Sequence, residues 1–281
     1  MDKSEAQFDE TISKAAELVK NARSLIITAG AGMGVDSGLP DFRGDSGFWQ
    51  AYPLYEKLGI NFVEMATPRH FQDDPEFGWG FYGHRSELYR KTVPHEGFSI
   101  LRNWIERFAF DSFVVTSNVD GQFQKAAFPE DRIVEVHGSI HFLQCQSPCT
   151  HEIWENDVSF EIDLETMRSK NLPRCSSCLE PSRPNVLMFN DWWWLPVRTN
   201  KQQKRFEAFI STCKKPLLVL ELGAGTSVPT IRHAGETLGR RHDATVIRIN
   251  PREAQIPGPH LSIDSSAAIA LKKIEYLLSQ V

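Results

Sequence analysis

The chain has 281 residues, of which 41% are hydrophobic and 24% charged, a composition typical of folded globular proteins that argues against disordered or low-complexity ones. Its length predicts one large domain, or a large domain that carries a smaller one. The formal net charge of −5 provides no general attraction for phosphate backbones, so nucleic acid is not an expected partner.

Short and continuous apolar runs mark the predicted strands. They lie at residues 25–28, 113–116, 133–136, 217–222, 245–249 and 261–263. Continuous apolarity predicts strands buried on both faces, as in a parallel sheet. Helical spacing of apolar residues precedes the first run and recurs at residues 96–108, 201–213, 230–239 and 265–278. The alternation predicts an α/β fold, a doubly wound parallel Rossmann-like sheet, with its ligand site beyond the carboxyl ends of the strands.

Two stretches interrupt this alternation. Residues 45–90 are rich in aromatic side chains, and residues 141–181 contain most of the cysteines. We expect both to be insertions that together form a smaller helical and zinc-binding module. Residues 1–44, 91–140 and 182–281 would then make the Rossmann-like domain. Within the module, the charged segment 152–170 is predicted to be a solvated arm.

The amino-terminal residues are acidic and lack the basic start and apolar run of a secretion signal. The apolar runs are also far shorter than the roughly 20 residues of a membrane helix. We therefore expect a soluble, cytoplasmic protein without a membrane partner. The sequence does not indicate an oligomeric state.

Four cysteines form two closely spaced pairs, Cys145 with Cys149 and Cys175 with Cys178. Two such pairs suit tetrahedral coordination of a structural zinc ion by four thiolates. The alternative is that the four cysteines form two disulfides or remain free thiols. A reducing cytoplasm disfavours the disulfides. The remaining Cys213 lies on a predicted helix and is expected to be a buried apolar thiol.

A glycine-rich segment, Gly30-Ala31-Gly32-Met33-Gly34, directly follows the first predicted strand. Glycines at such a point permit a tight turn and let the backbone approach a pyrophosphate. The spacing is GxGxG instead of GxGxxG, and the acidic residue expected about 20 positions later is absent. Taken alone, the motif is explained equally well by a purely structural turn.

Longer blocks of the sequence resemble the signatures of the sirtuins, the NAD-dependent protein deacylases. Residues 30–44 read GAGMGVDSGLPDFRG, residues 116–121 read TSNVDG, and residues 136–139 read VHGS. Residues 183–189 (RPNVLMF), 225–227 (GTS) and 249–250 (IN) resemble later family blocks in the same order. The resemblance spans nearly the whole chain. It implies NAD as co-substrate and an acyl-lysine protein or peptide as substrate.

The resemblance also implies roles for individual residues. His137 would be the base that activates a ribose hydroxyl after the acyl oxygen has displaced nicotinamide, a task suited to a side chain that titrates near neutrality. Asn118 and Asp120 would be catalytic residues of the ribose and nicotinamide pocket. The other implied cofactor contacts are Gly30, Ala31, Gly32, Asp41, Phe42, Arg43, Ser117, Gly225, Thr226, Ser227 and Asn250. The implied peptide contacts are Val186 and Phe189.

Without the resemblance, these residues have simpler interpretations. A lone histidine after a strand, such as His137, is more often packed or solvent-facing than catalytic. Asn118 and Asp120 are residue types that turns favour.

Tyr82 and Arg85 lie three residues apart on a predicted helix, so a phenol and a guanidinium can converge on one carboxylate. With Ala66-Thr67-Pro68 before them, they resemble the sirtuin class that removes succinyl and malonyl groups. In that class, this Tyr and Arg bind the acyl carboxylate. The alternative is an amphipathic helix with Arg85 in solvent.

The sequence thus predicts an NAD-dependent protein-lysine deacylase, acting on acetyl, succinyl or malonyl groups, that releases nicotinamide and O-acyl-ADP-ribose. An NAD glycohydrolase or protein ADP-ribosyltransferase is the alternative, since Ser117 and Asn190-Asp191 depart from the family pattern. A non-catalytic NAD sensor is a third interpretation. Consecutive aromatic residues cannot all face one core, so one or more of Trp192, Trp193 and Trp194 is expected to line a groove, interface or cleft.

Overall fold

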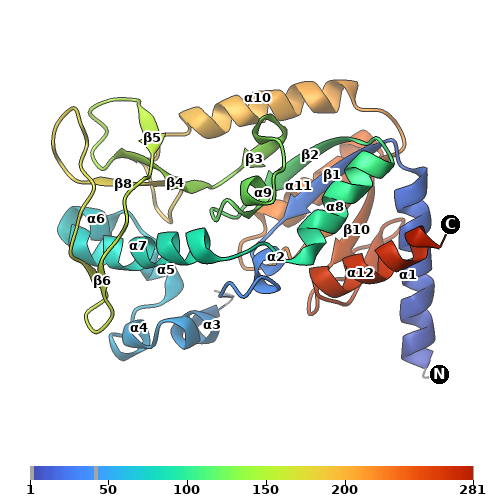
Figure 1. The fold of residues 1–281 in the computed structure, drawn as a ribbon, viewed down its shortest axis with the longest axis horizontal. Helices are drawn as coiled ribbons and strands as arrows, with labels where there is room; N and C mark the ends of the chain where they lie inside the picture. Colours follow the sequence, from blue (N-terminus) through green and yellow to red (C-terminus); the bar gives the residue numbers. More distant parts are fainter. Residues whose placement is uncertain (1–2, 41–43, 281) are drawn as a thin grey trace.

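The computed structural model describes residues 3–40 and 44–280. Its larger part is a six-stranded sheet in the order β11-β10-β9-β1-β2-β3 (Figure 1). All neighbouring strands of this sheet pair in parallel. Its strands are β1 (Ser24–Ala29), β2 (Asp111–Thr116), β3 (Ile133–Glu135), β9 (Leu217–Leu222), β10 (Thr245–Ile249) and β11 (Leu261–Ile263). The predicted parallel α/β sheet is confirmed, with every predicted strand in place.

The strand order reverses direction between β1 and β9. These strands pair from Ser24 with Leu217 to Ala29 with Leu222. On one side of this pair, β2 and β3 follow β1 toward one edge of the sheet. On the other side, β10 and β11 follow β9 toward the opposite edge. Open α/β sheets bind ligands at such a switch point, beyond the carboxyl ends of the strands. The loops after Ala29 and Leu222 are therefore positioned to form a site.

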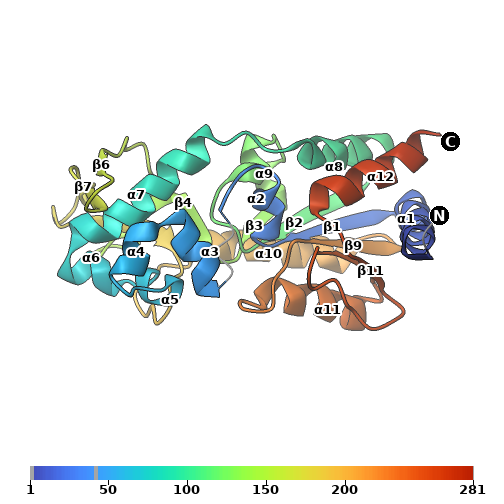
Figure 2. The same cartoon turned by 90° about the horizontal axis from the view of Figure 1, so that it is seen from below.

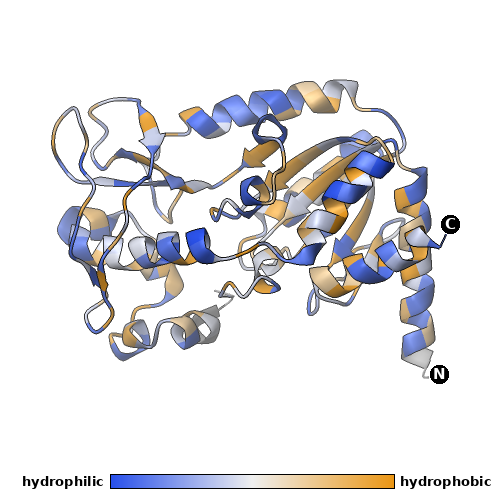
Figure 3. Cartoon of the chain, in the orientation of Figure 1, coloured by the Kyte–Doolittle hydropathy of each residue, from blue (hydrophilic) through white to orange (hydrophobic). Residues whose placement is uncertain are grey.

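Helices cover both faces of the sheet because side chains alternate along each strand. Leu25 and Ile27 of β1 pack into one apolar cluster, and Ile26 packs into another. Figure 2 shows α8 and α12 on one side of the sheet and α11 on the other, and Figure 3 shows the apolar strands between them. The covering helices are α1 (Lys3–Asn21), α8 (Glu96–Arg107), α10 (Val197–Thr212), α11 (Thr230–His242) and α12 (Ala267–Ser279).

Membrane-spanning helices are not found in the described parts of the chain, where no helix is both long and apolar enough to cross a bilayer. The predicted cytoplasmic location stays a prediction.

The second part of the molecule combines short helices with small antiparallel sheets. A three-stranded sheet has the order β5-β4-β8 and a two-stranded sheet joins β6 to β7. These strands are β4 (Gly138–Cys145), β5 (Ile153–Glu155), β6 (Ile162–Asp163), β7 (Arg168–Ser169) and β8 (Ser182–Val186). The helices are α3 (Gly44–Ala51), α4 (Pro53–Lys57), α5 (Phe62–Met65), α6 (Arg69–Asp73) and α7 (Pro75–Lys91). There are also three short helical turns beside the large sheet. After β1 comes α2 (Gly32–Val35), after β2 comes α9 (Gln122–Lys125), and before β3 comes η1 (Glu130–Arg132).

An aromatic core holds this second part together. Phe48, Tyr55, Trp79 and Phe81 are fully buried in one apolar cluster. Phe48 stacks on Tyr55 with ring centroids 5.5 Å apart, and Phe81 meets Phe48 edge to face at 5.7 Å. The aromatic residues noted in the sequence therefore form a core of their own. The predicted domain boundaries at residues 44, 90, 140 and 181 stay predictions.

Two local predictions are wrong. Segment 152–170 is not simply a solvated arm, because Phe160 and Met167 are buried in the aromatic core. Phe160 stacks on Trp79 with ring centroids 4.6 Å apart. The charged residues around them concealed this apolar face. Cys213 caps the carboxyl end of α10 and is half-buried, instead of lying inside a helix as a buried thiol.

Candidate active site

The carboxyl ends of the central strands open into one cavity of about 700 Å³. This volume falls within the range of about 300–1,000 Å³ that is typical of ligand sites. The loops after β1, β2, β3 and β9 meet there with side chains of α7 and with the segment after β8. The predicted site residues that line it are Gly30, Ala31, Tyr82, Arg85, Ser117, Asn118, Asp120, His137, Val186, Phe189, Gly225, Thr226 and Ser227. Their chemical roles stay predictions.

Two predicted cofactor contacts lie behind the cavity wall. The Gly32 amide donates to the Gly223 carbonyl at 3.0 Å. Asn250 is fully buried, and its Nδ2 donates to the Ala224 carbonyl at 2.8 Å. Its Oδ1 accepts hydrogen bonds from the backbone amides of Arg252 and Glu253, each at 3.0 Å. Asn250 therefore fixes loops that line the cavity without lining it itself. The predicted contacts Asp41, Phe42 and Arg43 lie outside the described residues.

The glycine after β1 allows two loops to pack backbone against backbone. A Cβ atom on Gly30 would lie 2.8 Å from the carbonyl oxygen of Gly223. Gly223 itself has φ +61°, and a Cβ there would lie 2.4 Å from the backbone of Gly32 and Met33. Both positions therefore exclude larger residues. This contact explains why glycines follow β1 without the GxGxxG spacing.

Asn118 ties the loop after β2 to the loop after β1. Its Nδ2 donates to the Gly30 carbonyl at 3.0 Å, and its backbone amide donates to Thr116 Oγ1 at 3.0 Å. Thr116 Oγ1 donates in turn to the Ala29 carbonyl at 3.0 Å. The loops after β1 and β2 are thus held in a fixed arrangement beside the strand-order reversal.

Asp120 is a buried carboxyl group in the cavity wall. Burial raises its pKa from the usual 3.8 to about 6, against the opposing effect of the Gln122 backbone amide, which donates to Oδ1 at 2.9 Å. Its carbonyl oxygen contacts Nε2 of His141 at 2.9 Å, and the next residue, Gly121, has φ +68°. The carboxylate is therefore held rigidly where ionisation is unfavourable, a pattern that is common at functional sites.

The raised pKa of Asp120 predicts a stability cost at high pH. The folded pKa lies above the ordinary value, so the folded state disfavours ionisation, and the cost grows from about pH 4 to pH 6 and is constant above it. Asp120→Asn should therefore raise the free energy of unfolding by about 3 kcal/mol at pH 8 and by about 1 kcal/mol at pH 4.5. Urea unfolding at both pH values measures this difference. The exposed Asp157→Asn variant is the control, and a less stable Asp120→Asn protein at pH 8 contradicts the prediction.

His137 follows β3 and lies in the cavity wall. Its Nε2 lies 3.3 Å from Oγ1 of Thr230, the first residue of α11. Burial lowers the pKa of the ring, and a hydrogen bond with the Ser117 backbone acts in the opposite direction. The carbonyl oxygen of His137 accepts from the Leu187 amide at 2.9 Å. Burial therefore favours the neutral ring, the form that can accept a proton as a general base must.

Helix α7 contributes Tyr82 and Arg85 to the lining of the cavity. Both are buried, with 1% and 6% of their surfaces exposed, so the alternative of Arg85 in solvent is wrong. Arg85 donates from Nε and Nη2 to the hydroxyl of Tyr89, at 2.9 and 2.7 Å. Its guanidinium lies 5.0 Å from the ring centroid of Phe81. Sequence reasoning missed Tyr89, although its position four residues after Arg85 on a helix predicts contact.

The segment after β8 is anchored at both ends of its turn. The Phe189 amide donates to the Ala66 carbonyl at 2.9 Å. Arg183 and Asp191 form a fully buried ion pair, and Asp191 also accepts from the amides of Met188 and Trp193 at 3.3 and 3.2 Å. Asp191, one of the departures from the family pattern, thus fixes the turn that carries the predicted peptide contacts.

The consecutive tryptophans lie outside the main cavity. Trp192 is 92% exposed, the consequence of a turn that buries the preceding aspartate. Together with Ser147, Pro148 and Leu195, the residues Trp192, Trp193 and Trp194 line a separate pocket of about 390 Å³. The expectation that a tryptophan lines a groove is confirmed.

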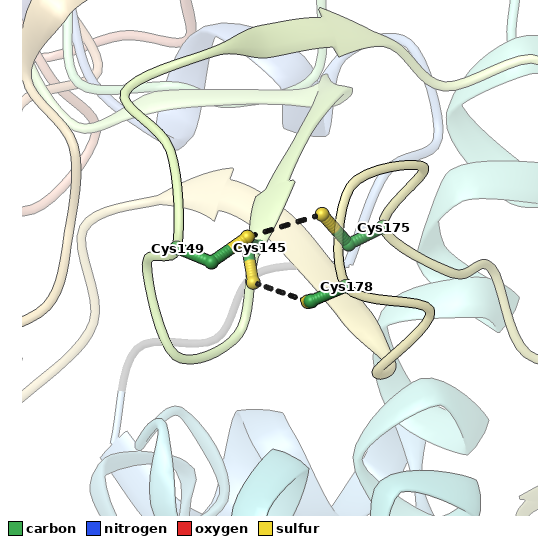
Figure 4. Close-up of side chains that lie close together, drawn as sticks. All are labelled: Cys145, Cys149, Cys175 and Cys178. Atoms are coloured by element: carbon green, nitrogen blue, oxygen red, sulfur yellow. Dashed lines mark hydrogen bonds between the residues drawn. The ribbon is translucent and has the colours of Figure 1, made fainter.

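The four cysteines converge at the end of β4 (Figure 4). Their sulfur atoms all lie within 4.8 Å of one another. Cys145 and Cys178 are 3.6 Å apart at sulfur, as are Cys149 and Cys175, which is too far for the roughly 2.05 Å bond of a disulfide. Four converging thiols match the donor set and arrangement of a structural zinc site, and they leave no coordination position open for chemistry.

Comparison with known proteins identifies the family. A sequence model of the Sir2 family matches residues 30–227. The chain belongs to the Sir2 family. It is 28% identical over 245 residues to an NAD-dependent protein deacylase of Thermococcus sibiricus, covering 87% of each chain. It is 30% identical over 206 residues to one of Pyrococcus furiosus, covering 73% of each chain.

The fold is also that of solved Sir2 proteins. A structure described as a Sir2 homolog in complex with NAD matches with a TM-score of 0.72 and 22% identity, covering 95% of this chain and 94% of that one. In the present Sir2 protein, the cavity crosses the β1–β9 switch point, where a dinucleotide binds in doubly wound folds. Backbone groups after both strands line it, so its position, size and lining fit NAD.

Proposed function

We propose that this Sir2 family member is an NAD-dependent protein-lysine deacylase that releases nicotinamide and O-acyl-ADP-ribose. The observation that carries the proposal is a single cavity that joins the loops of the strand-order reversal to His137 and to Tyr82 and Arg85 of α7. Membership of the Sir2 family and the names of the curated relatives support it.

NAD, when bound, supplies the ribose carbon that accepts the acyl oxygen as nicotinamide departs. His137, held near Thr230 with its pKa lowered by burial, takes a proton from a ribose hydroxyl. Asp120, once ionised, places a negative charge in the cavity wall, which stabilises positive charge that develops at the ribose. Asn118 keeps the loops after β1 and β2 together around that point.

Nicotinamide release that depends on an acyl-lysine peptide tests this proposal. The zinc-loaded protein is incubated with NAD, with and without an acetyl-lysine or succinyl-lysine peptide. Release that rises with the peptide and disappears with an unmodified lysine peptide is the expected result. The same rate of release without any peptide contradicts it.

Tyr82 and Arg85, the hydrogen-bond donors on α7, favour acyl groups that carry a carboxylate, such as succinyl or malonyl. Arg85→Met removes a charge-assisted hydrogen bond, so kcat/KM for succinyl-lysine should fall about 10- to 100-fold, far more than for acetyl-lysine. Steady-state kinetics on paired peptides measure this ratio. Arg69→Met, at an exposed ion pair with Asp73, is the matched control. Equal losses on both peptides would refute the assignment.

An NAD glycohydrolase or ADP-ribosyltransferase would use the same cavity with water or a protein side chain as acceptor. Ser117, where the sirtuin pattern has Gln, lines that cavity and is the feature that favours this alternative. His137 favours the deacylase, because that base is needed chiefly after the acyl oxygen has attacked.

A further inference from the structure

Tyr89 has a hydroxyl hydrogen that the described part of the chain leaves without an acceptor. A phenol oxygen accepts through two lone pairs and donates one hydrogen. Arg85 donates to this oxygen twice, from Nε at 2.9 Å and from Nη2 at 2.7 Å. Both lone pairs are therefore occupied, and the hydrogen must point elsewhere. Tyr89 is 5% exposed and is one of the residues that line the cavity.

Tyr82 lies two helical turns earlier on α7 and also has a hydroxyl hydrogen without an acceptor in the described part of the chain. It is 1% exposed and lines the cavity, and its hydroxyl has no hydrogen-bond partner among the residues that the structure describes. Burial raises the pKa of Tyr82 to about 12 and also raises that of Tyr89, so both phenols keep their hydrogens at physiological pH. A cavity wall that presents two hydroxyl donors without an acceptor among the described residues is matched to a ligand that offers acceptors.

The guanidinium between them adds positive charge to this donor set. Arg85 lies 5.4 Å from the ring centroid of Tyr82 and 5.3 Å from that of Tyr89. These ring contacts and the two hydrogen bonds to the Tyr89 hydroxyl fix the plane of the guanidinium. The three side chains thus present hydrogen-bond donors to the cavity around a fixed positive charge.

We propose that Tyr89 is a specificity-determining residue that donates its hydroxyl hydrogen to the carboxylate of an acidic acyl group. With Arg85 and Tyr82 it makes a three-donor carboxylate subsite. This inference rests on the proposed deacylase function and extends it. A carboxylate satisfies the buried phenol hydrogens, whereas an acetyl group offers them no acceptor. Sites built on hydrogen bonds reject analogues that lack the bonding group more strongly than apolar pockets do.

A purely positioning role for Tyr89 makes a different prediction. If Tyr89 only holds Arg85, its loss has no effect once Arg85 is gone. If Tyr89 donates directly, its loss weakens binding of the acidic acyl group even without Arg85. A double-mutant cycle of Arg85→Met and Tyr89→Phe separates the two roles.

The experiment measures kcat and KM for succinyl-lysine and acetyl-lysine peptides with the full, zinc-loaded chain. Tyr89→Phe is expected to lower kcat/KM for succinyl-lysine about 10- to 100-fold, mainly through KM, and far more than for acetyl-lysine. In the Arg85→Met background, Tyr89→Phe should lower kcat/KM for succinyl-lysine by about threefold or more. The exposed Tyr276→Phe is the matched control.

Equal activity of the double variant and Arg85→Met overturns the proposal, because Tyr89 then acts only through Arg85. Turnover of acetyl-lysine with none of succinyl-lysine also overturns it, while the deacylase function stands. Nicotinamide release with neither peptide refutes the proposed function itself, and this inference with it. If Tyr89→Phe lowers the melting temperature, Tyr89→His, which keeps a ring donor and acceptor, should restore part of the succinyl preference. Failure of that rescue in a folded protein also counts against the proposal.

Discussion

His137→Ala is expected to lower acyl-lysine turnover by about 100- to 10,000-fold, the range typical for loss of a general base. The ring contributes little to the apolar core, and its neighbours Val136 and Gly138 are held by backbone contacts. The variant should therefore fold, and the loss should appear in kcat. Nicotinamide release and O-acyl-ADP-ribose formation are measured together on an acetyl-lysine peptide.

The control for this experiment is His151→Ala, which removes an exposed histidine near the cysteine site. It should leave turnover within about twofold, as is usual for surface changes. NAD consumption that stays at the normal rate in His137→Ala would contradict the deacylase mechanism. It would favour the glycohydrolase or ADP-ribosyltransferase alternative, in which this base is not required.

Loss of zinc is expected to unfold the part of the chain around the cysteines and to abolish activity. Zinc binding to structural four-ligand sites contributes on the order of 10–16 kcal/mol, comparable with the whole stability of a domain. Cys145 is buried at the end of β4, and Cys145 pairs in the sheet with Ser182 at the start of β8. Because β8 leads to the predicted peptide contacts, loss of structure around the cysteines should also displace residues that line the cavity.

Cys145→Ser and treatment with a strong chelator should both lower the melting temperature and stop turnover. Metal analysis should find one zinc ion per chain in the unmodified protein and none in the variant. Cys213→Ser, at the half-buried cap of α10, is the matched control and should retain zinc. A metal-free protein with an unchanged melting temperature would contradict the assignment.

The parallel sheet was predictable from the sequence because each strand carries a local signal. Leu217–Leu222, for example, is a continuous apolar run except for one glutamate, and its burial on both faces follows from that pattern. The buried Glu221 is tolerated because Arg248 on the neighbouring strand donates to it at 2.5 Å. That contact joins residues far apart in the chain, and no local pattern reveals it.

The parts of the fold and of the site that the sequence did not predict depend on contacts between segments that are far apart in the chain. The pairing of β4 with β8 joins two strands with short individual signals, and neither was among the predicted strands. Asn250 has the residue type of a ligand contact, but only its burial shows that it holds loops instead. The spacing of Tyr89 from Arg85 allows a contact on one helix face, but only the hydrogen bonds in the structure identify Tyr89 as a site residue.

The most direct test of the deacylase proposal identifies every product of one reaction. The zinc-loaded protein is incubated with NAD and a succinyl-lysine or acetyl-lysine peptide, and the mixture is analysed by mass spectrometry. Deacylated peptide, nicotinamide and O-acyl-ADP-ribose in equal amounts are the predicted result. Free ADP-ribose that forms without peptide, or protein that gains the mass of ADP-ribose, would show that the cavity transfers ADP-ribose to another acceptor and would contradict it.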